Sequence, residues 1–320
     1  MIGFERSRRV FLAGAAALAA MLAAPAGAMD PRYTDANGDL TADPPADAKD
    51  WLDPDVLIFA YTPVEDPAVY AKVWEGFLAH LEEKTGKRVQ FFPVQSNAAQ
   101  IEAMRAGRLH VAGFNTGSNP LAVNCAGFVP FAMMASADGS YGYEMEIITY
   151  PGSGIDTVED IKGKKLAFTA PTSNSGYKAP SAMLKAEYGL EAEKDFEPVF
   201  SGKHDNSIIG VANKDYPAAA VANSVLQRMV ARDVVQPEQL VSLYKSQTFP
   251  TTGYSLVYNL KPELAESIRD AFFSFPWEGS ALAAEFEKSG EARFIPIDYK
   301  THWEVVRQID AAMGGSYDCR

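Results

Sequence analysis

Segments with strand-like and helix-like periodicity alternate along this chain, and the alternation starts twice. The first series runs from 55 to 112 and the second from 165 to 232. Alternation of this kind builds parallel sheets that are covered by helices. The predicted strands are 56–60, 89–92, 109–112, 165–168, 196–200, 218–221 and 255–258, and the predicted helices are 67–84, 98–106, 181–188, 207–212, 225–232, 263–273, 281–288 and 302–312. The sequence therefore predicts an α/β protein with two lobes, each a mainly parallel sheet flanked by helices.

The chain is expected to return to its first lobe near the end. A first crossing between the lobes is predicted near 146–150 and a second at Phe249–Gly253. The first lobe then consists of 55–148 plus 251–320, and the second of 149–250. Two crossings of this kind form a hinge about which lobes close.

Short polar residues follow six of the predicted strands, just before the next helix begins. These turns are Tyr61-Thr62, Gln95-Ser96-Asn97, Phe114-Asn115-Thr116-Gly117, Thr172-Ser173-Asn174-Ser175-Gly176-Tyr177, Ser201-Gly202-Lys203-His204-Asp205-Asn206-Ser207 and Asn223-Ser224. Ligands of open α/β sheets bind at the carboxyl ends of strands. Free N–H groups at a helix start hold an oxyanion there. A single such turn would serve only as a helix cap. Six of them predict two sheet edges that face one another across a ligand-binding cleft.

The strongest candidate residues lie in two of these turns. Ser173, Asn174 and Ser175 are consecutive, whereas a helix cap needs only one side chain. His204 is a candidate hydrogen-bond donor, and if it donates to a bound dianion its pKa should rise, so that binding weakens at alkaline pH. Asp205 either orients the histidine, accepts a proton from a protonated oxyanion, or caps its helix, and the sequence leaves these possibilities open.

Further candidates lie in the other turns. In the first lobe they are Tyr61, Asn97 and Thr116, and in the second lobe Asn223. A structural role in their own turns is the alternative for each of them.

Catalysis is the weaker interpretation of these residues. Ser175, His204 and Asp205 have the composition of a triad, but the Gly-x-Ser-x-Gly elbow is absent, and an adjacent His and Asp point in different directions at a helix start. The sequence contains no Walker loop, His-Glu-x-x-His zinc pair or dinucleotide fingerprint. We therefore expect a binding protein without cofactor or metal, and not an enzyme.

Residues 1–28 have the organisation of an export signal. Arg8 and Arg9 precede an Ala-rich apolar run that extends to Ala24, and the small residues Ala26-Gly27-Ala28 follow. This order is typical of a secretory signal, and the arginine pair matches the twin-arginine type. The run is short for a membrane anchor, which is the alternative. The sequence predicts a periplasmic protein whose mature chain starts at Met29.

The acidic composition limits the partners of the mature chain. The net charge of the whole chain is −12, and without the export segment, which carries +2, it becomes −14. A protein this acidic is a poor candidate for binding nucleic acid or anionic lipid. An anion site must then depend on local donors, because the overall field opposes it.

Residues 29–54 are rich in Pro, Asp and Ala and are expected to form an extended leader. Within it Asp35, Asn37 and Asp39 resemble the start of a calcium loop. Leu40 stands where such a loop needs glycine, and no glutamate closes it. A solvated turn is the favoured interpretation and calcium binding is the alternative.

The chain has two cysteines, Cys125 and Cys319. In an oxidising compartment they are expected to form a disulfide that ties the C-terminal tail to the body of the protein. Two unrelated thiols are the alternative. Two cysteines alone do not form a structural zinc site.

Two of the polar turns carry a family resemblance. Ser173–Tyr177 with Pro180, and Ser201–Asp205 with Val211–Asn213, resemble motifs of the phosphate/phosphite/phosphonate-binding (PhnD-like) proteins of ABC importers. The likeness extends over roughly 55–302. It implies a two-lobed periplasmic binding protein of type II-like fold with a two-crossing hinge. It also implies that Ser173, Asn174, Ser175 and His204 bind the phosphoryl group.

The resemblance further implies a function. A small tetrahedral oxyanion (phosphate, phosphite or a simple phosphonate) is captured and delivered to an ABC permease in the inner membrane, by a protein that we expect to be a monomer. The alternatives are a sensor of phosphorus or arsenic oxyanions that docks onto a histidine kinase and, from a different class, a periplasmic hydrolase.

This chain departs from the family pattern at three positions. Asn174 replaces a common threonine, and Asn97 stands where an aromatic residue is frequent. Ala222 or Asn223 occupies the place of an acidic residue that aminophosphonate binders use. Without that carboxylate an aminophosphonate loses its counter-charge, which favours phosphate, phosphite or a simple phosphonate as the ligand.

Overall fold

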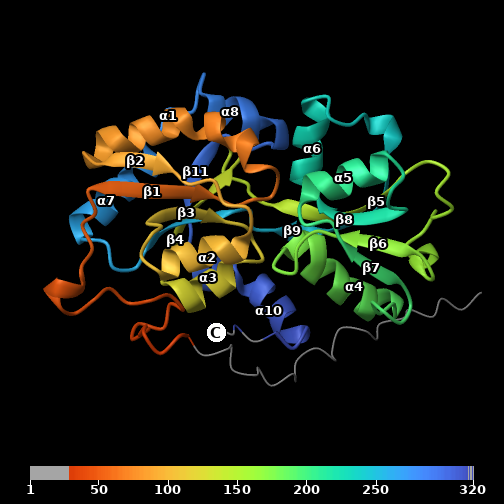
Figure 1. Cartoon of the computed structure of the whole chain (residues 1–320), viewed down its shortest axis with the longest axis horizontal. Coiled ribbons are helices and arrows are strands. Elements are labelled where there is room, and N and C mark those ends of the chain that lie inside the picture. The colour runs from red at the N-terminus through yellow and green to blue at the C-terminus, as the bar shows by residue number, and fades with distance from the viewer. Residues whose placement is uncertain (1–28, 316, 318, 320) are drawn as a thin grey trace, which may run out of the picture.

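The computed structural model describes residues 29–315, 317 and 319. The export signal expected at 1–28 lies outside these described residues. The described chain folds into two α/β lobes that lie side by side (Figure 1). Within 29–315, every helix is too short or too polar to cross a membrane.

The first lobe is built on a sheet of six strands in the order β11-β4-β10-β3-β1-β2. Strand β1 pairs in parallel with both β2 and β3, whereas β10 is antiparallel to β3 and β4, and β11 is antiparallel to β4. The bounds are β1 Val56–Tyr61, β2 Arg88–Phe91, β3 Val111–Phe114, β4 Phe128–Ala135, β10 Gly253–Val257 and β11 Arg293–Pro296.

The second lobe repeats the same plan in a sheet of five strands, in the order β7-β6-β8-β5-β9. Strand β6 is parallel to β7 and β8, and β5 is antiparallel to β8 and β9. The bounds are β5 Tyr143–Thr149, β6 Lys165–Phe168, β7 Glu197–Phe200, β8 Ala218–Ala222 and β9 Val241–Phe249. The two-lobed α/β prediction is confirmed, and each sheet is mixed because antiparallel strands extend its parallel core.

Helices cover both sheets, as Figure 1 shows. They are α1 Pro67–Thr85, α2 Asn97–Arg105, α3 Asn119–Ala126, α4 Ala179–Tyr188, α5 His204–Ala212, α6 Asn223–Ala231, α7 Pro262–Phe273, α8 Ala281–Phe286, α9 Tyr299–His302 and α10 Glu304–Ala312, with short 3-10 turns at Ala48–Asp50, Glu159–Ile161, Pro237–Gln239 and Glu287–Ser289.

The longest helix, α1, shows how local sequence sets these elements. Asp66 caps its first turn by accepting the N–H of Ala68, and Gly86 ends it with a φ of 66°. The buried face is Tyr70, Trp74, Phe77 and Leu81. The apolar period alone would place Val69 on this face, but Val69 is 37% exposed because the larger aromatic side chains at 70 and 74 occupy the core.

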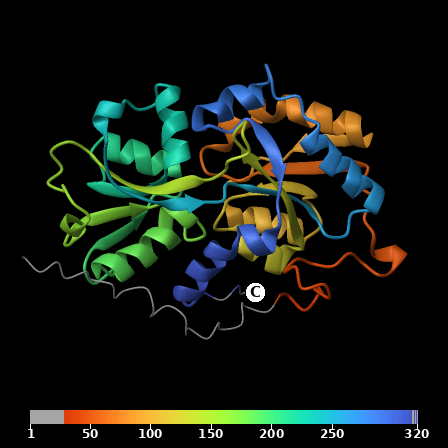
Figure 2. The same ribbon diagram turned by 180° about the vertical axis from the view of Figure 1, so that it is seen from behind.

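Each lobe has its own hydrophobic core, and the chain passes between the lobes twice. It leaves the first sheet after β4 and enters the second at β5, then returns between β9 and β10. The boundary expected at 148/149 falls inside β5, which pairs only within the second sheet. The first crossing therefore lies between Ala135 and Tyr143. Seen from behind, α10 lies across the junction between the lobes (Figure 2).

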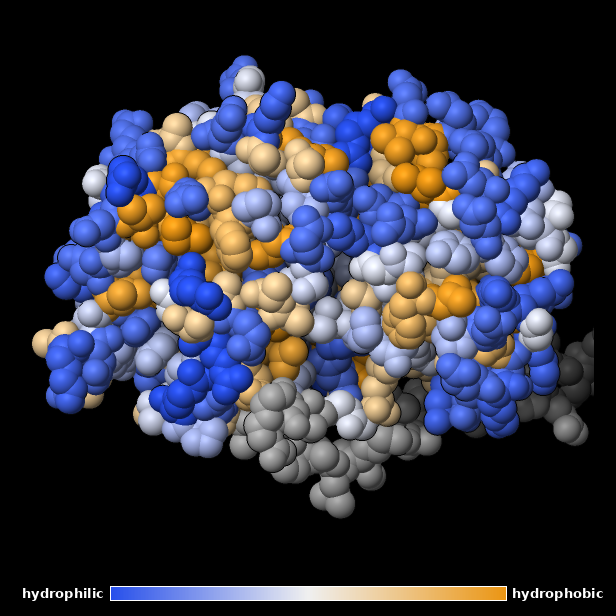
Figure 3. Space-filling model, in the orientation of Figure 1, coloured by the Kyte–Doolittle hydropathy of each residue, from blue (hydrophilic) through white to orange (hydrophobic). Residues whose placement is uncertain are grey.

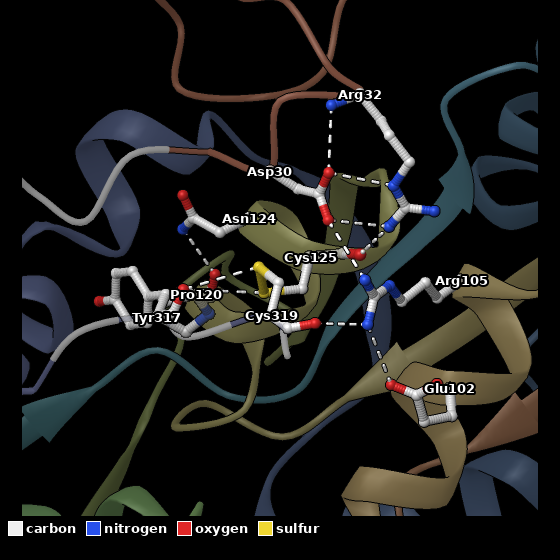
Figure 4. The surroundings of a disulfide bond; sticks show 9 residues. All are labelled: Asp30, Arg32, Glu102, Arg105, Pro120, Asn124, Cys125, Tyr317 and Cys319. Atoms are coloured by element: carbon white, nitrogen blue, oxygen red, sulfur yellow. Dashed lines mark hydrogen bonds and ion pairs between the residues drawn. A yellow bond between two sulfur atoms is a disulfide. The ribbon is translucent and has the colours of Figure 1, made fainter.

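The N-terminal segment 29–54 packs on the first lobe. The N–H of Asp30 donates to the carbonyl of Asn124 at 2.9 Å. Its carboxylate binds Arg32 and lies 3.5 Å from Arg105 (Figure 4). The carboxylate of Asp30 has a lowered pKa, mainly because of the hydrogen bond from Arg32. These contacts, all on the first lobe, hold the leader in place.

The segment that resembles a calcium loop closes on itself. Side-chain oxygens of Asp35 and Asn37 accept the N–H of Asp39 at 3.0 and 2.9 Å, and Asp39 in turn accepts the N–H of Thr41. Within 29–315, 317 and 319, no cluster of three or more His, Cys, Asp or Glu residues could hold a metal. The acidic side chains here act as turn caps.

A disulfide joins Cys125 at the end of α3 to Cys319, across 194 residues of sequence, with a Cα–Cα distance of 5.2 Å (Figure 4). The guanidinium of Arg105 donates to the carbonyl of Cys319. The hydroxyl of Tyr317 donates to Asp310 of α10 at 2.9 Å. The tail is thereby attached to the first lobe.

Replacing both cysteines with serine is expected to lower the free energy of unfolding by about 2–5 kcal/mol, because the unfolded chain gains the freedom of a long open loop. Denaturant unfolding of the exported protein measures this change. Reductant should destabilise the wild type by a similar amount and leave the double variant unchanged. Equal stability of oxidised wild type and double variant would contradict the expectation.

Candidate functional site

The carboxyl ends of the two sheets face each other, and the polar turns meet around a central cavity. Its volume is about 50 Å³. Tyr61 lines it from the end of β1, Thr116 from the turn after β3, and His204 from the turn after β7. Ser173, Asn174 and Ser175 line it from the turn after β6. Six of the eight predicted ligand-binding residues are thus brought together at one place.

The serine-rich turn forms a short π-helix, Asn174–Lys178, that leads into α4. The hydroxyl of Ser173 accepts the N–H of Gly176 at 3.0 Å and so caps this helix. A Cβ at Gly176 would lie 1.9 Å from Oγ1 of Thr169, so only glycine fits here. The N–H groups of a first helical turn lack intrahelical partners. The turn therefore presents backbone donors together with the side chains of 173–175.

His204 is the first residue of α5 and is 5% exposed. Its Nδ1 accepts the backbone N–H of Ala222 at 3.1 Å, which fixes the tautomer with the proton on Nε2. Nε2 lies 3.3 Å from the hydroxyl of Ser173. Burial, reinforced by the charge of Arg228, lowers the pKa of His204 to about 3.

His204 is therefore a neutral donor at physiological pH. The geometry opposes the expectation that its pKa rises when it donates to a dianion, because protonation at Nδ1 would break the bond from Ala222 and place a charge in a dry site. Because His204 is already neutral near pH 7, its titration gives no reason for binding to weaken at alkaline pH.

Tyr61 and Thr116 line the cavity from the first lobe. Tyr61 packs against Tyr70 and Tyr254, and burial raises its pKa, so its hydroxyl stays protonated and can donate. The hydroxyl of Thr116 donates to the carbonyl of Pro250 at 2.7 Å. This bond attaches the turn after β3 to the second crossing.

The structure places Asn97 and Asn223 outside the central cavity. The amide of Asn97 donates to Thr62 at 3.0 Å, and its oxygen accepts from Asn115 at 2.8 Å, at the wall of a second pocket. The side chain of Asn223 binds the backbone N–H and the carboxylate of Glu144, at 3.0 and 3.1 Å, in a pocket on the hinge side.

Asp205 does not orient the histidine. Its carboxylate accepts the backbone N–H of Asp66 in the other lobe at 3.1 Å. Burial raises its pKa above the ordinary value. The residue thus serves as a contact between the lobes.

Sequence reasoning missed Arg228, which lines the cavity from α6 and is 3% exposed. Burial opposes its charge, but neighbouring Tyr70, Tyr61 and Glu65 raise its pKa, so it stays protonated. A signal was present, since Arg228 follows Ser224 by four residues and so lies on the same face of the helix that begins at the sixth polar turn, Asn223-Ser224. Ser224 also lines the cavity.

The two lobes touch directly around the cavity. The N–H of His204 donates to the carbonyl of Val64 at 3.1 Å, and Nζ of Lys178 donates to the carbonyl of Gly117 at 2.8 Å. Lys203 reaches Gln95 at 3.1 Å. Hydrophilic residues predominate where the lobes meet on the face shown in Figure 3. The structure is that of a closed cleft.

A model of the family described as "ABC transporter, phosphonate, periplasmic substrate-binding protein" matches residues 59–303. The chain is 27% identical over 274 residues to the phosphate-import protein PhnD of Mycolicibacterium smegmatis. This alignment covers 82% of this chain and 84% of that relative. It is also 27% identical over 235 residues to the phosphonates-binding periplasmic protein of Escherichia coli, in an alignment that covers 70% of this chain and 69% of that relative.

Solved structures with the same fold include a binding protein component of an ABC phosphonate transporter from Pseudomonas aeruginosa. It has a TM-score of 0.71 and 25% identity, covering 81% of this chain and 86% of that one. PhnD1 from Prochlorococcus marinus, solved in complex with methylphosphonate, has a TM-score of 0.73 at 17% identity. That match covers 82% of this chain and 99% of the PhnD1 chain. Both support the two-lobed fold class.

The imidazole of His204 is expected to stay uncharged well below its ordinary pKa of 6.5, because its folded pKa is about 3. Long-range ¹H–¹⁵N NMR should show a protonated Nε2 and a bare Nδ1 from neutral pH down to about pH 4. The His204→Gln variant identifies the signals. A titration midpoint near 6.5 would contradict the assignment of a neutral donor.

The same pKa predicts an effect on stability. Below pH 6.5 the unfolded chain binds this proton, whereas the folded chain binds it only near pH 3, so folding stability falls as the pH drops through this range. The contribution is at most about 1.4 kcal/mol per pH unit. Denaturant unfolding of His204→Gln should show a shallower acid dependence than the wild type, and equal slopes would exclude this contribution.

Proposed function

Because this chain belongs to the family of periplasmic substrate-binding proteins of phosphonate ABC transporters, whose model matches 59–303, we propose that it captures a small tetrahedral oxyanion and delivers it to an inner-membrane ABC permease. The ligand is phosphate, phosphite or a simple phosphonate. Export through the twin-arginine pathway to the periplasm, and action as a monomer, belong to the same proposal.

The observation that carries the proposal is the convergence of donors from both lobes on one small cavity. Ser173 to Ser175 and His204 come from the second lobe and Tyr61 from the first. The cavity volume is about 50 Å³. Since one water needs roughly 10–15 Å³ on this measure, the cavity has space for a few water-sized groups. A tetrahedral anion with a small substituent fits that size, and an extended organic substituent does not.

The donor types support the same ligand class. Neutral hydroxyl, imidazole and backbone N–H groups donate hydrogen bonds to the oxygens of an oxyanion. The family position that would carry a carboxylate for an ammonium group is Ala222 or Asn223 here, and the side chain of Asn223 is bound to Glu144. The phosphate import of the mycobacterial relative and the methylphosphonate held by the cyanobacterial protein agree with this size and charge.

Titration calorimetry with phosphate, phosphite and methylphosphonate tests the proposal. At least one should bind, and Ser175→Ala should weaken that binding by about 10-fold or more, the cost of one hydrogen bond to a charged group. Ser181→Ala is the matched control, because Ser181 lies on α4 and does not line the cavity. Folded protein that binds none of the three would overturn the proposal.

Gly117 offers a test of lobe closure. A Cβ at this position would lie 2.3 Å from the carbonyl oxygen of Thr172 and 2.4 Å from the amide nitrogen of Asn174, both in the backbone of the other lobe. Gly117→Ala should therefore hold the cleft partly open and lower the affinity for the bound oxyanion by about 10-fold or more, since such a contact cannot relax cheaply.

The matched control for Gly117→Ala is Gly76→Ala, whose Cβ would meet nothing within 4 Å on α1. With saturating ligand, small-angle scattering should give a larger radius of gyration for Gly117→Ala than for the control. Thermal unfolding without ligand should be similar for both. Unchanged affinity and scattering in Gly117→Ala would show that the closed form does not require this contact.

A further inference from the structure

Arg228 is a buried cation whose guanidinium lies over the ring of Phe286, 5.2 Å from the ring centroid, and forms one hydrogen bond within the described chain. Its Nη1 donates to the hydroxyl of Ser289 at 2.9 Å. Its Nε has no hydrogen-bond partner among the described residues. An ionised group buried in this way is costly unless an anion compensates it.

The nearby carboxylates are held more closely by other groups. Glu65 accepts from Tyr70 and pairs with Arg232, and Glu285 lies 3.2 Å from Arg232 and 3.0 Å from Lys288. Arg228 lies farther from both, at 3.7 Å from Glu65 and 3.8 Å from Glu285. These distances allow Coulomb attraction but exceed those of a charge-assisted hydrogen bond. The positive charge of Arg228 is therefore only loosely neutralised.

Arg228 is also placed to reach a ligand. Within the described part of the chain, it is the one Arg or Lys whose side chain lines the central cavity, together with Ser173 and His204. Since His204 is neutral, no other lining side chain in the described structure supplies a positive charge.

We propose that Arg228 supplies the positive charge for the bound oxyanion, and that the site consequently prefers the dianionic form of its ligand. The inference rests on the proposed function and specifies the charge state of the ligand. Arg228 belongs to the second lobe, while Ser289, Glu65 and Glu285 belong to the first. A dianion bound to Arg228 therefore favours the same closed arrangement that these contacts stabilise.

Several titratable or charged groups face Arg228. They are Glu65 after β1, Tyr61 on β1, Tyr70 on α1, His204 on α5, Arg232 just after α6, Tyr254 on β10, Glu285 on α8 and Glu291 before β11. Glu291 lines the cavity, and burial raises its pKa despite the charge of Arg228. Among these groups, Glu291 is the one whose titration must be separated from that of the ligand.

The test is titration of methylphosphonate into the full exported protein at about pH 5.5 and about pH 8.5, on either side of its second ionisation. Wild type should bind more tightly at the higher pH. Arg228→Gln should lose about 100-fold or more at the higher pH, and its affinity should no longer rise with pH. Arg228→Lys keeps a charge and should keep the rise, which provides a folded comparison.

Arg232→Gln is the matched control, because it removes a cation from the same cluster at a residue that does not line the cavity. The Arg232→Gln substitution should lower the affinity for methylphosphonate by a similar factor at both pH values, because it weakens only the contacts that hold the two lobes closed. In the Glu291→Gln variant the affinity for methylphosphonate should still rise with pH, whatever the effect of the substitution on the affinity itself.

Three outcomes would overturn the inference. They are an Arg228→Gln variant that retains the pH dependence, an Arg232→Gln variant that loses it equally, and a Glu291→Gln variant that abolishes it. Wild-type protein that binds no phosphate, phosphite or methylphosphonate would instead refute the proposed function itself. Circular dichroism and thermal unfolding establish that each variant is folded.

Discussion

The hydrogen bond from the backbone of Ala222 to Nδ1 of His204 determines the electrostatic character of the site. It connects the end of β8 to the start of α5 and leaves Nε2 as a donor toward the cavity. Because the imidazole is buried and its second nitrogen is committed, it does not take a second proton near neutral pH. The other donors of the serine-rich turn are also neutral. In our proposal, the buried guanidinium of Arg228 supplies the positive charge that these neutral donors lack.

Much of the fold could be predicted from the sequence, because βα alternation is a strong local signal. Strand β6 was predicted at its observed bounds, and α1 and α7 differ by one residue at an end. Among the antiparallel strands, β10 was predicted as 255–258, whereas β4, β5, β9 and β11 were missed. β4 and β5 follow one another without an intervening helix, and β9 is an edge strand whose residues are largely polar and exposed. Such strands belong to no βα unit, so periodicity alone does not distinguish them from loops.

The site could be predicted to the level of its turns but not of its individual contacts. Polar residues at strand ends identified the edge where Ser173, Ser175, His204 and Tyr61 meet. The same rule also selected Asn97 and Asn223, which hydrogen-bond to neighbouring protein groups instead. Turn position does not reveal which way a side chain is oriented. Arg228 was missed for the converse reason, because it lies inside a helix and approaches the cavity only through the tertiary packing of α6.

The C-terminal tail has a consequence for how the lobes can separate. Asp310 of α10 forms an ion pair at 2.8 Å with Lys178, which belongs to the serine-rich turn of the second lobe. Nearby Tyr317 binds Asp310, and Cys319 is covalently bonded to α3 of the first lobe. The Lys178–Asp310 ion pair thus adds a third connection between the lobes beside the two crossing segments. A movement that separates Lys178 from Asp310 must break this ion pair, so the C-terminal helix opposes opening of the cleft at that place.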